Sequence, residues 1–228
     1  MSKTKRKIDR TGRKLVAYTT PKSFVSEQFR NVRTNINFSM ADKEIRSLAI
    51  TSAAPAEGKS TAAANLAVVF AQEGKKVLLI DGDMRKPTMH HTFEIRNTVG
   101  LSSVLTRRLP VEAAIKKGPI SGLHLLTCGP IPPNPAELLA SETMAHLIQH
   151  LGKSYDLVIF DSPPILSVAD GKLIADHCEG TVLIINSGTT EKRGALKAKE
   201  MIELTSSKLL GIVLNNFTPT KETYYYHY

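Results

Sequence analysis

The sequence predicts an α/β fold with a doubly wound, mainly parallel sheet, and three observations lead to this prediction. Short apolar runs alternate with longer stretches of helical periodicity, which is the pattern of successive βαβ units. The runs 77–80 and 157–160 are apolar at every position, as expected of central strands that are buried on both faces. Polar residues follow several of these runs directly, and ligands of such sheets bind at the carboxyl ends of the strands.

The expected elements follow one another along the chain. Residues 23–42 form an amphipathic surface helix, because apolar residues recur at helical spacing from Val25 to Met40. The predicted strands are 47–51, 77–80, 123–127, 157–160, 181–186 and 209–214, and the further predicted helices are 58–73, 136–151 and 191–205.

The composition is that of a folded globular chain. Of 228 residues, 42% are hydrophobic and 22% are charged, which excludes collagen-like, coiled-coil and wholly disordered proteins. No run approaches the ~20 apolar residues of a membrane span, and the basic start lacks the apolar block of a secretory signal. Two cysteines are too few for a disulfide framework or a closed zinc site. We therefore expect a cytoplasmic protein without an anchor of its own.

Three segments are expected: a basic arm at 1–22, one domain at 23–216, and a mobile, tyrosine-rich tail at 217–228. Seven Lys or Arg residues against Asp9 alone fall within 1–14, so six of the nine net positive charges lie there. Such an arm either contacts an anionic surface such as lipid or nucleic acid, or is simply solvated.

The strongest local signal is the segment 52–61, Ser-Ala-Ala-Pro-Ala-Glu-Gly-Lys-Ser-Thr, between a predicted strand and a predicted helix. In a phosphate-binding loop of this kind, backbone N–H groups and the helix N-terminus face an anion. Lys59 would reach the β- and γ-phosphates and Ser60 would bind Mg²⁺. The predicted nucleotide-binding residues are Ala54, Pro55, Ala56, Glu57, Gly58, Lys59, Ser60 and Thr61.

Two alanines stand in this loop where glycine is usual. The common pattern opens with Gly at the position of Ala53, and Gly is also frequent at the position of Ala56. A positive φ at either alanine would cost about 1 kcal/mol, because the Cβ atom crowds the backbone there.

Acidic residues end two of the predicted strands. Asp81 and Asp83 follow the run 77–80, and Asp161 follows the run 157–160. An Asp after a strand is commonly a turn or helix cap. Together with the phosphate-binding loop, these carboxylates instead indicate a nucleotide site. Asp161 would support Mg²⁺, and Asp81 and Asp83 are available for the metal or for a nucleophile.

With these motifs, the chain resembles the bacterial tyrosine kinases (BY-kinases) of capsule and exopolysaccharide synthesis from Glu27 to its end. The three nucleotide motifs of that family match 53–61, 77–85 and 157–164. Its oligomerisation motif, a Glu and two Arg at three-residue spacing, matches Glu27, Arg30 and Arg33, and its terminal tyrosine cluster matches Tyr224, Tyr225, Tyr226 and Tyr228. Without the resemblance, Glu27, Arg30 and Arg33 would be interpreted as a solvated helix face.

The resemblance implies a P-loop fold of the deviant Walker (MinD/ParA-like) type and an autophosphorylating protein-tyrosine kinase that uses ATP and Mg²⁺. Lys59 would hold the phosphates, Asp81 would accept the tyrosine proton, and Ser60, Asp83 and Asp161 would hold the metal. A free Asp with a pKa of ~3.9 is poorly matched to a phenol at ~10, so Asp81 should mainly orient the hydroxyl. The four terminal tyrosines would be phosphorylated in trans. Asn215 and Asn216, after the last predicted strand, are candidate adenine contacts by position only.

The resemblance also implies partners. These are further copies of the chain in a ring, tyrosine-bearing protein substrates, and a transmembrane adaptor on a separate chain that recruits the kinase to the inner face of the cell membrane. No nucleic acid is expected. The alternative is a positioning or partitioning ATPase of the MinD/ParA kind. Those ATPases carry a signature Lys in the loop where this chain has Ala54, and the tyrosine tail also disfavours them.

Overall fold

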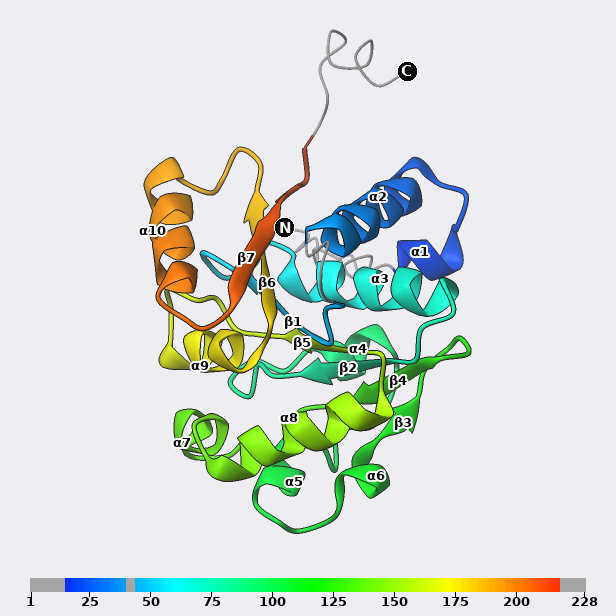
Figure 1. The fold of residues 1–228 in the computed structure, drawn as a ribbon, viewed down its shortest axis with the longest axis vertical. Coiled ribbons are helices and arrows are strands. Elements are labelled where there is room, and N and C mark those ends of the chain that lie inside the picture. The colour runs from blue at the N-terminus through cyan, green and yellow to red at the C-terminus, as the bar shows by residue number, and fades with distance from the viewer. Residues whose placement is uncertain (1–14, 40–43, 218–228) are drawn as a thin grey trace, which may run out of the picture.

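A seven-stranded sheet runs through the centre of the computed structural model, which describes residues 15–39 and 44–217 (Figure 1). The strand order is β3-β4-β2-β5-β1-β6-β7, and every neighbouring pair is parallel except β3 with β4. The strands are β1 (Ser47–Ser52), β2 (Val77–Asp81), β3 (Lys116–Lys117), β4 (Leu123–Leu126), β5 (Leu157–Asp161), β6 (Gly180–Asn186) and β7 (Lys208–Asn215). The predicted doubly wound, mainly parallel sheet is therefore confirmed.

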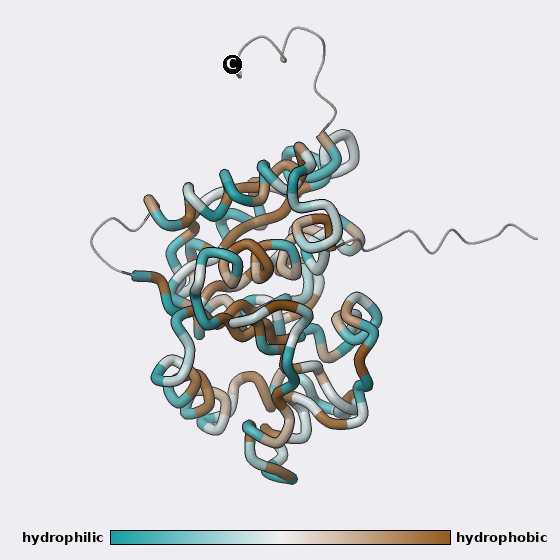
Figure 2. Tube along the Cα trace, turned by 90° about the vertical axis from the view of Figure 1, so that its right-hand side faces the viewer, coloured by the Kyte–Doolittle hydropathy of each residue, from teal (hydrophilic) through white to brown (hydrophobic). Residues whose placement is uncertain are grey.

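Helices cover both faces of this sheet. One face carries α1 (Val16–Thr19), α2 (Phe24–Phe38), α3 (Lys59–Gln72) and α4 (Met89–Thr92). The other carries α5 (Leu101–Leu105), α6 (Val111–Ala114), α7 (Pro135–Leu139), α8 (Glu142–Ser154), α9 (Ala169–His177) and α10 (Lys192–Glu203). Each face has its own hydrophobic core, and Figure 2 shows the most hydrophobic segments running through the interior. Strands β1, β2 and β5 are buried at every position, as the continuous apolar runs 77–80 and 157–160 predict for β2 and β5.

The helix after the phosphate-binding loop, α3, is buried on almost all sides. Because α1 and α2 lie over the side of α3 that faces away from the sheet, nearly every residue from Lys59 to Ala71 is shielded. Ala17 of α1 is fully buried, and its backbone N–H donates to Asn65 of α3 over 2.9 Å. Although α1 falls within the segment predicted as a basic arm, it packs with the domain. The basic residues at 1–14 lie outside the described ranges.

Three helical predictions differ from the structure. The single helix predicted at 136–151 is two helices, because Ser141 caps a new one: its hydroxyl accepts the Met144 N–H over 3.3 Å. The helix predicted at 23–42 is α2, and Val25, which was placed on its apolar face, has 48% of its surface exposed. Third, the structure contains helices that were not expected, namely α1, α4, α5, α6 and α9.

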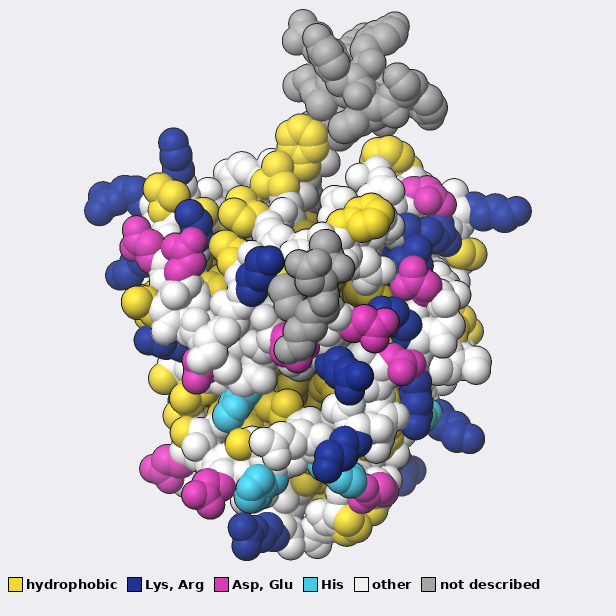
Figure 3. All heavy atoms as spheres, viewed as in Figure 1, with side chains coloured by type: hydrophobic (Ala, Val, Ile, Leu, Met, Phe, Trp, Pro, Cys, Tyr) yellow, Lys and Arg dark blue, Asp and Glu magenta, His cyan; other side chains and the backbone are white. Residues whose placement is uncertain are grey.

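The sheet edge at β7 is only partly covered. Ile212, Leu214 and Phe217 are each about half exposed, and Figure 3 shows hydrophobic side chains gathered along this part of the surface. Charged side chains of both signs are scattered over the rest of this face. Within 15–39 and 44–217, no helix combines the length and hydrophobicity that crossing a bilayer requires.

Candidate functional site

The site lies where the carboxyl ends of β1, β2 and β5 meet. The parallel register of β2 and β5 sets Asp81 opposite Asp161, so the two strand ends bring these carboxylates to neighbouring positions. The loop 53–58 connects β1 to α3 beside them. The fold therefore brings the phosphate-binding loop, Asp81 and Asp161 together at one edge of the sheet, as the sequence predicted.

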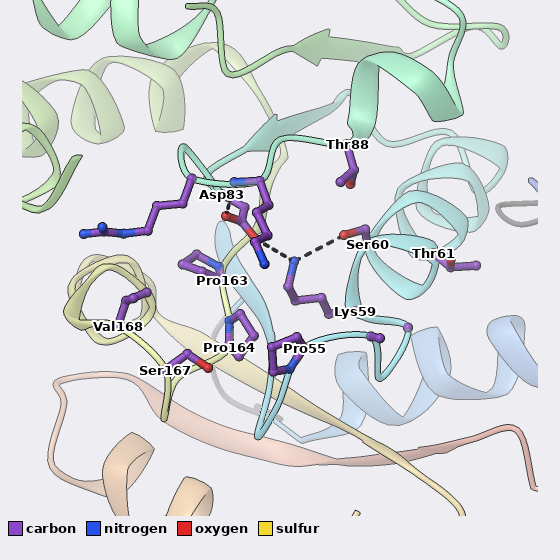
Figure 4. Close-up of a pocket in the computed structure, with 14 residues that line it drawn as sticks. Pro55, Lys59, Ser60, Thr61, Asp83, Thr88, Pro163, Pro164, Ser167 and Val168 are labelled. Atoms are coloured by element: carbon purple, nitrogen blue, oxygen red, sulfur yellow. Dashed lines mark hydrogen bonds and ion pairs between the residues drawn. The ribbon is translucent and has the colours of Figure 1, made fainter. Parts of the chain in front are cut away.

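A cavity of about 620 Å³ opens at this place (Figure 4). Its wall includes six of the eight predicted nucleotide-binding residues; Ala54 and Glu57 do not line it. The loop after β2 and the loop after β5 form the remaining wall. The lining residues are Pro55, Ala56, Gly58, Lys59, Ser60, Thr61, Asp83, Arg85, Lys86, Thr88, Pro163, Pro164, Ser167 and Val168.

Lys59, at the first position of α3, is surrounded by oxygen atoms. Its Nζ lies 3.0 Å from Asp83 Oδ2, 3.6 Å from Asp161 Oδ1 and 3.3 Å from the Ser60 hydroxyl, and Figure 4 shows it between Asp83 and Ser60. Burial alone would lower the pKa of Lys59, but the charges of Asp161 and Asp83 outweigh it and the net direction is upward. Lys59 is therefore a fixed positive charge on the cavity wall.

Asp81 lies behind this wall. It is fully buried, and its Oδ2 accepts hydrogen bonds from the backbone N–H groups of Thr88 (2.9 Å) and Met89 (3.0 Å). Its Oδ1 has no hydrogen-bond partner in the part of the chain that the structure describes. Burial, and then the charge of Asp161, raise the pKa of Asp81 to about 7, against the two backbone N–H groups and Lys59. This carboxyl is a far better match for a phenol than a free Asp.

Ser60, Asp83 and Asp161 are the residues whose oxygen atoms face Lys59. Burial raises the pKa of Asp161, and Lys59 and a hydrogen bond with Ser60 act in the opposite direction. A hydroxyl and one or two carboxylates suit Mg²⁺, which keeps several waters and binds substrate phosphates. No cluster of three or more His, Cys, Asp or Glu arranged to hold a metal occurs within residues 15–39 and 44–217. The donors present therefore fit a metal that phosphates and water would help to coordinate.

The two alanines of the loop behave differently. Ala56 has a φ of 65°, in the left-handed region, whereas Ala53 keeps a negative φ and is buried. The predicted strain therefore exists only at Ala56. Gly58 has a φ of 94°, which residues other than glycine rarely adopt, and an added Cβ would lie 2.0 Å from the Asn215 side-chain nitrogen and displace it.

Two predicted nucleotide contacts are turned elsewhere. The Glu57 carboxylate accepts the Ala54 N–H over 2.9 Å and the hydroxyl of Thr190, away from the cavity. Asn216 also lies off the cavity wall, and its side chain donates to Asn186 over 3.1 Å. Its neighbour Asn215 contacts the loop instead, donating to the Glu57 carbonyl over 2.9 Å.

The residues of the predicted oligomerisation motif lie on α2, away from the cavity. Arg30 pairs with Glu27 one turn earlier and donates to the Pro21 carbonyl over 2.8 Å. Arg33 donates to the Val69 carbonyl of α3 over 2.9 Å, so it holds α2 on α3 within one chain. The predicted acceptors Tyr224, Tyr225, Tyr226 and Tyr228 lie outside the described residues.

One ion pair beside the cavity was not foreseen. Arg85, after β2, donates from Nε (2.9 Å) and from one terminal nitrogen (3.0 Å) to the two carboxylate oxygens of Asp170. Asp170 is fully buried in the first turn of α9. Arg85 stands in a recognisable motif, but no local pattern singles out a partner 85 residues away.

Comparisons with known proteins show which proteins the chain is similar to. A protein-family model described as an AAA domain matches residues 45–187. The tyrosine-protein kinase YwqD of Bacillus subtilis is 52% identical over 228 residues, which is all of this chain and 96% of that protein. The putative tyrosine-protein kinase CapB of Staphylococcus aureus is 43% identical, with 94% of each chain covered.

Solved structures show the same relation. The chimerical protein CapA2B2 superimposes with a TM-score of 0.87 at 46% identity, covering 90% of each chain. The cell division ATPase MinD of Pyrococcus furiosus gives 0.67 at 23% identity, covering 78% of this chain and 75% of that one. The second likeness is one of fold alone.

Proposed function

Because this chain belongs to the bacterial tyrosine-protein kinases of capsule and exopolysaccharide systems, we propose that the cavity around Lys59 is its kinase site. Membership of this family implies ATP binding. The observation that carries the placement is the charged Lys59 on the cavity wall, held between Asp83 and Asp161 at the N-terminus of α3. Kinase chemistry needs positioned positive charge more than covalent participation, because the phosphoryl group is transferred through a loose transition state.

The residues present fit a magnesium nucleotide. Ser60 and Asp83 line the cavity, and Asp161 lies beside Lys59, so these three would hold the metal. ATP supplies the phosphoryl group when bound, and Mg²⁺ supplies positive charge beside its phosphates. The α3 N-terminus and the amides of Gly58, Lys59 and Ser60 would bind phosphate oxygens.

The two carboxylates after β2 have different places and therefore different roles. Asp83 lines the cavity and contacts Lys59, so we assign it to the substrate side of the site. Asp81 lies behind it, with a pKa near neutrality and one carboxylate oxygen without a hydrogen-bond partner among the described residues. We keep Asp81 as the acceptor of the tyrosine proton. If this is right, Asp81→Asn should lower kcat with little change in the KM for ATP, whereas Asp83→Asn should change both.

The acceptors proposed are the four terminal tyrosines. The tail follows β7, whose Asn215 contacts the phosphate-binding loop. Twelve residues beyond Asn216 span at most about 40 Å when extended, which is long enough to reach a neighbouring copy. We propose that phosphorylation occurs in trans between copies of the chain.

One mixing experiment tests the activity and its direction. An active chain with Phe at positions 224, 225, 226 and 228 is incubated with γ-labelled ATP and a full chain carrying Lys59→Met. Label should appear on the Lys59→Met chain only when both are present, and each chain alone serves as the control. Label released only as inorganic phosphate would instead favour the MinD-like ATPase, which no feature of this site supports better. If the Lys59→Met chain stays unlabelled in this mixture while the wild-type chain alone labels itself, the reaction occurs in cis.

Association of copies is proposed to involve α2. Glu27 is exposed, whereas Arg33 is committed to α3 within its own chain, so Glu27 and Arg30 are the members of the motif that would meet a neighbour. Glu27→Ala should reduce the fraction of oligomer without lowering the melting temperature. Arg33→Ala should reduce both the fraction of oligomer and the melting temperature. Light scattering after gel filtration, with thermal melting alongside, separates the two. An unchanged mass for Glu27→Ala would remove α2 from the proposed interface.

Recruitment is proposed to depend on a separate transmembrane adaptor. The support is the family relation and the basic composition of residues 1–14, which suits an anionic membrane surface. Deleting residues 1–14 should weaken binding to anionic vesicles at low salt, where charge attraction is least screened. Unchanged vesicle binding would remove the arm from this role.

A further inference from the structure

Glu57 is set apart from its neighbours in the phosphate-binding loop. Residues 55, 56 and 58–61 all line the cavity, and Glu57 does not. It is only 4% exposed. A carboxylate in this loop would repel phosphates if it faced them, so its burial on the opposite side removes an unfavourable charge from the cavity wall. A buried carboxylate in turn requires hydrogen-bond partners.

Its partners come from a distant part of the chain. One oxygen accepts the Ala54 N–H over 2.9 Å within the loop, and the other accepts the hydroxyl of Thr190, 133 residues away. Thr190 lies between β6 and α10, and its hydroxyl oxygen accepts the Asn186 N–H over 2.8 Å. The Thr190 hydroxyl therefore both accepts and donates, and its geometry is fixed by the end of β6.

The backbone of Glu57 is held as well. Asn215, at the end of β7, donates its side-chain N–H to the Glu57 carbonyl over 2.9 Å. The loop is thus bound at one residue by the ends of two further strands, β6 and β7. These contacts lie on the side of the loop away from Asp83 and the cavity.

The residues flanking Glu57 explain why such anchoring matters. Ala56 has a φ of 65° and Gly58 a φ of 94°, so both neighbours of Glu57 have left-handed backbone. Alanine resists this conformation where glycine would accept it freely, so this loop tends to leave the conformation in which its N–H groups line the cavity. A ligand that binds only that conformation loses affinity in proportion to the fraction of molecules that have left it.

We infer that Glu57 and Thr190 form a clasp that holds the phosphate-binding loop in its strained, anion-binding conformation. Glu57 is then a positioning residue: it does not touch the substrate, and it acts through the backbone of Ala56 and Gly58. The inference rests on the proposed nucleotide site. It states that Glu57 and Thr190 increase the affinity of this site for nucleotide.

Glu57→Gln tests the clasp with nearly unchanged size. An amide can accept the Ala54 N–H with its oxygen and donate its own N–H to the Thr190 hydroxyl, so charge-assisted bonds to a carboxylate are replaced by weaker neutral ones. The dissociation constant for Mg·ADP by calorimetry and the KM for ATP should each rise roughly five- to tenfold, the loss expected when a charge-assisted hydrogen bond is replaced by a neutral one of about half its strength. Because the clasp is remote from the phosphoryl acceptor, kcat should change by less than about twofold.

Substitutions at Thr190 supply an independent test and a matched control. Thr190→Val removes the hydroxyl and should reproduce the Glu57→Gln affinity loss, whereas Thr190→Ser keeps the hydroxyl and should bind like the wild type. Glu203→Gln removes a surface carboxylate of α10 that pairs with Lys199, and it should leave the affinity for Mg·ADP unchanged. Equal affinities for Thr190→Val and Thr190→Ser would overturn the inference.

The strain itself is tested by a double substitution. Glycine at position 56 adopts the left-handed conformation without the clasp, so Ala56→Gly combined with Glu57→Gln should recover most of the lost affinity. If the double variant binds as weakly as Glu57→Gln, the clasp does not act through loop strain and the inference fails. If the wild-type chain itself binds no Mg·ADP, the proposed site fails instead, and the two failures are thereby distinguished.

Discussion

Replacing Ala56 by glycine should stabilise the protein, although glycine usually destabilises. The Ala56 side chain is exposed and its φ is 65°, so the methyl group contributes little packing. Removing it relieves about 1–2 kcal/mol of left-handed strain. The greater freedom of glycine in the unfolded chain offsets about 0.4–1 kcal/mol of that gain. The free energy of unfolding should therefore rise by about 0.5–1 kcal/mol, which raises the melting temperature by about 1–4 °C for a chain of this size.

The matched control is Ala53→Gly, at the other alanine where glycine is usual. Ala53 has a negative φ and its methyl group is buried in the core. This substitution removes about 0.8 kcal/mol of burial and adds about 0.5–1 kcal/mol of backbone entropy cost, so it should destabilise by about 1.5 kcal/mol. Urea unfolding of both variants without nucleotide measures the difference. If Ala56→Gly destabilises the protein as much as Ala53→Gly, the left-handed backbone at Ala56 does not cost the folded state free energy.

Three other predictions address the charges and thiols of the site and core. Lys59→Met should lower kinase activity at least about 100-fold, measured by label transfer. It should also lower the free energy of unfolding by about 3 kcal/mol, because buried carboxylates lose their cation. An unchanged midpoint of urea unfolding would show that Lys59 does not compensate these carboxylates. Arg85→Ala should destabilise by about 2 kcal/mol, because Asp170 is left buried without its cation, and Arg85→Lys should recover only part of this in the same assay. Burial, with the charges of Asp81 and Asp83, raises the pKa of Cys128 to about 12, and burial also raises the pKa of Cys178. Neither thiol should therefore react with a disulfide reagent at pH 8 until the chain is unfolded. Any slow reaction of the native chain should accelerate as the pH rises, because thiolate forms, and a fast native reaction at pH 8 would be contrary to the burial of both thiols.

The sheet could be predicted from the sequence because its signals are local. Fully apolar runs such as 77–80 require burial on both faces, and the structure has strands at all six predicted positions. The helix predicted at 136–151 was less secure, since one hydroxyl at Ser141 divides it and leaves the apolar periodicity unaltered. The two-residue strand β3 and the short helix α1 have too few residues to show a period, and they exist because they pack on β4 and α3.

Only those parts of the site that depend on residues close together in the sequence, or on strand order, could be predicted. The order strand, loop, lysine and helix places Lys59, and the parallel register brings Asp81 and Asp161 together. The direction of the Glu57 side chain was not predictable, because its partner Thr190 is distant in the sequence. Which alanine carries a positive φ depends on the conformation of the whole loop, and no property of the two alanines separates them beforehand.

The charges around Lys59 explain why this site should take nucleotide and metal together. Without ligands, Lys59 is the cation that makes burial of Asp83 and Asp161 tolerable, and these carboxylates in turn keep Lys59 charged. A bound polyphosphate would draw on the same positive charge and would leave the two carboxylates less well compensated. A divalent cation beside them would restore the charge balance and would also neutralise the phosphates. We therefore expect nucleotide and metal to bind more tightly together than separately, because both would act on the charge of Lys59.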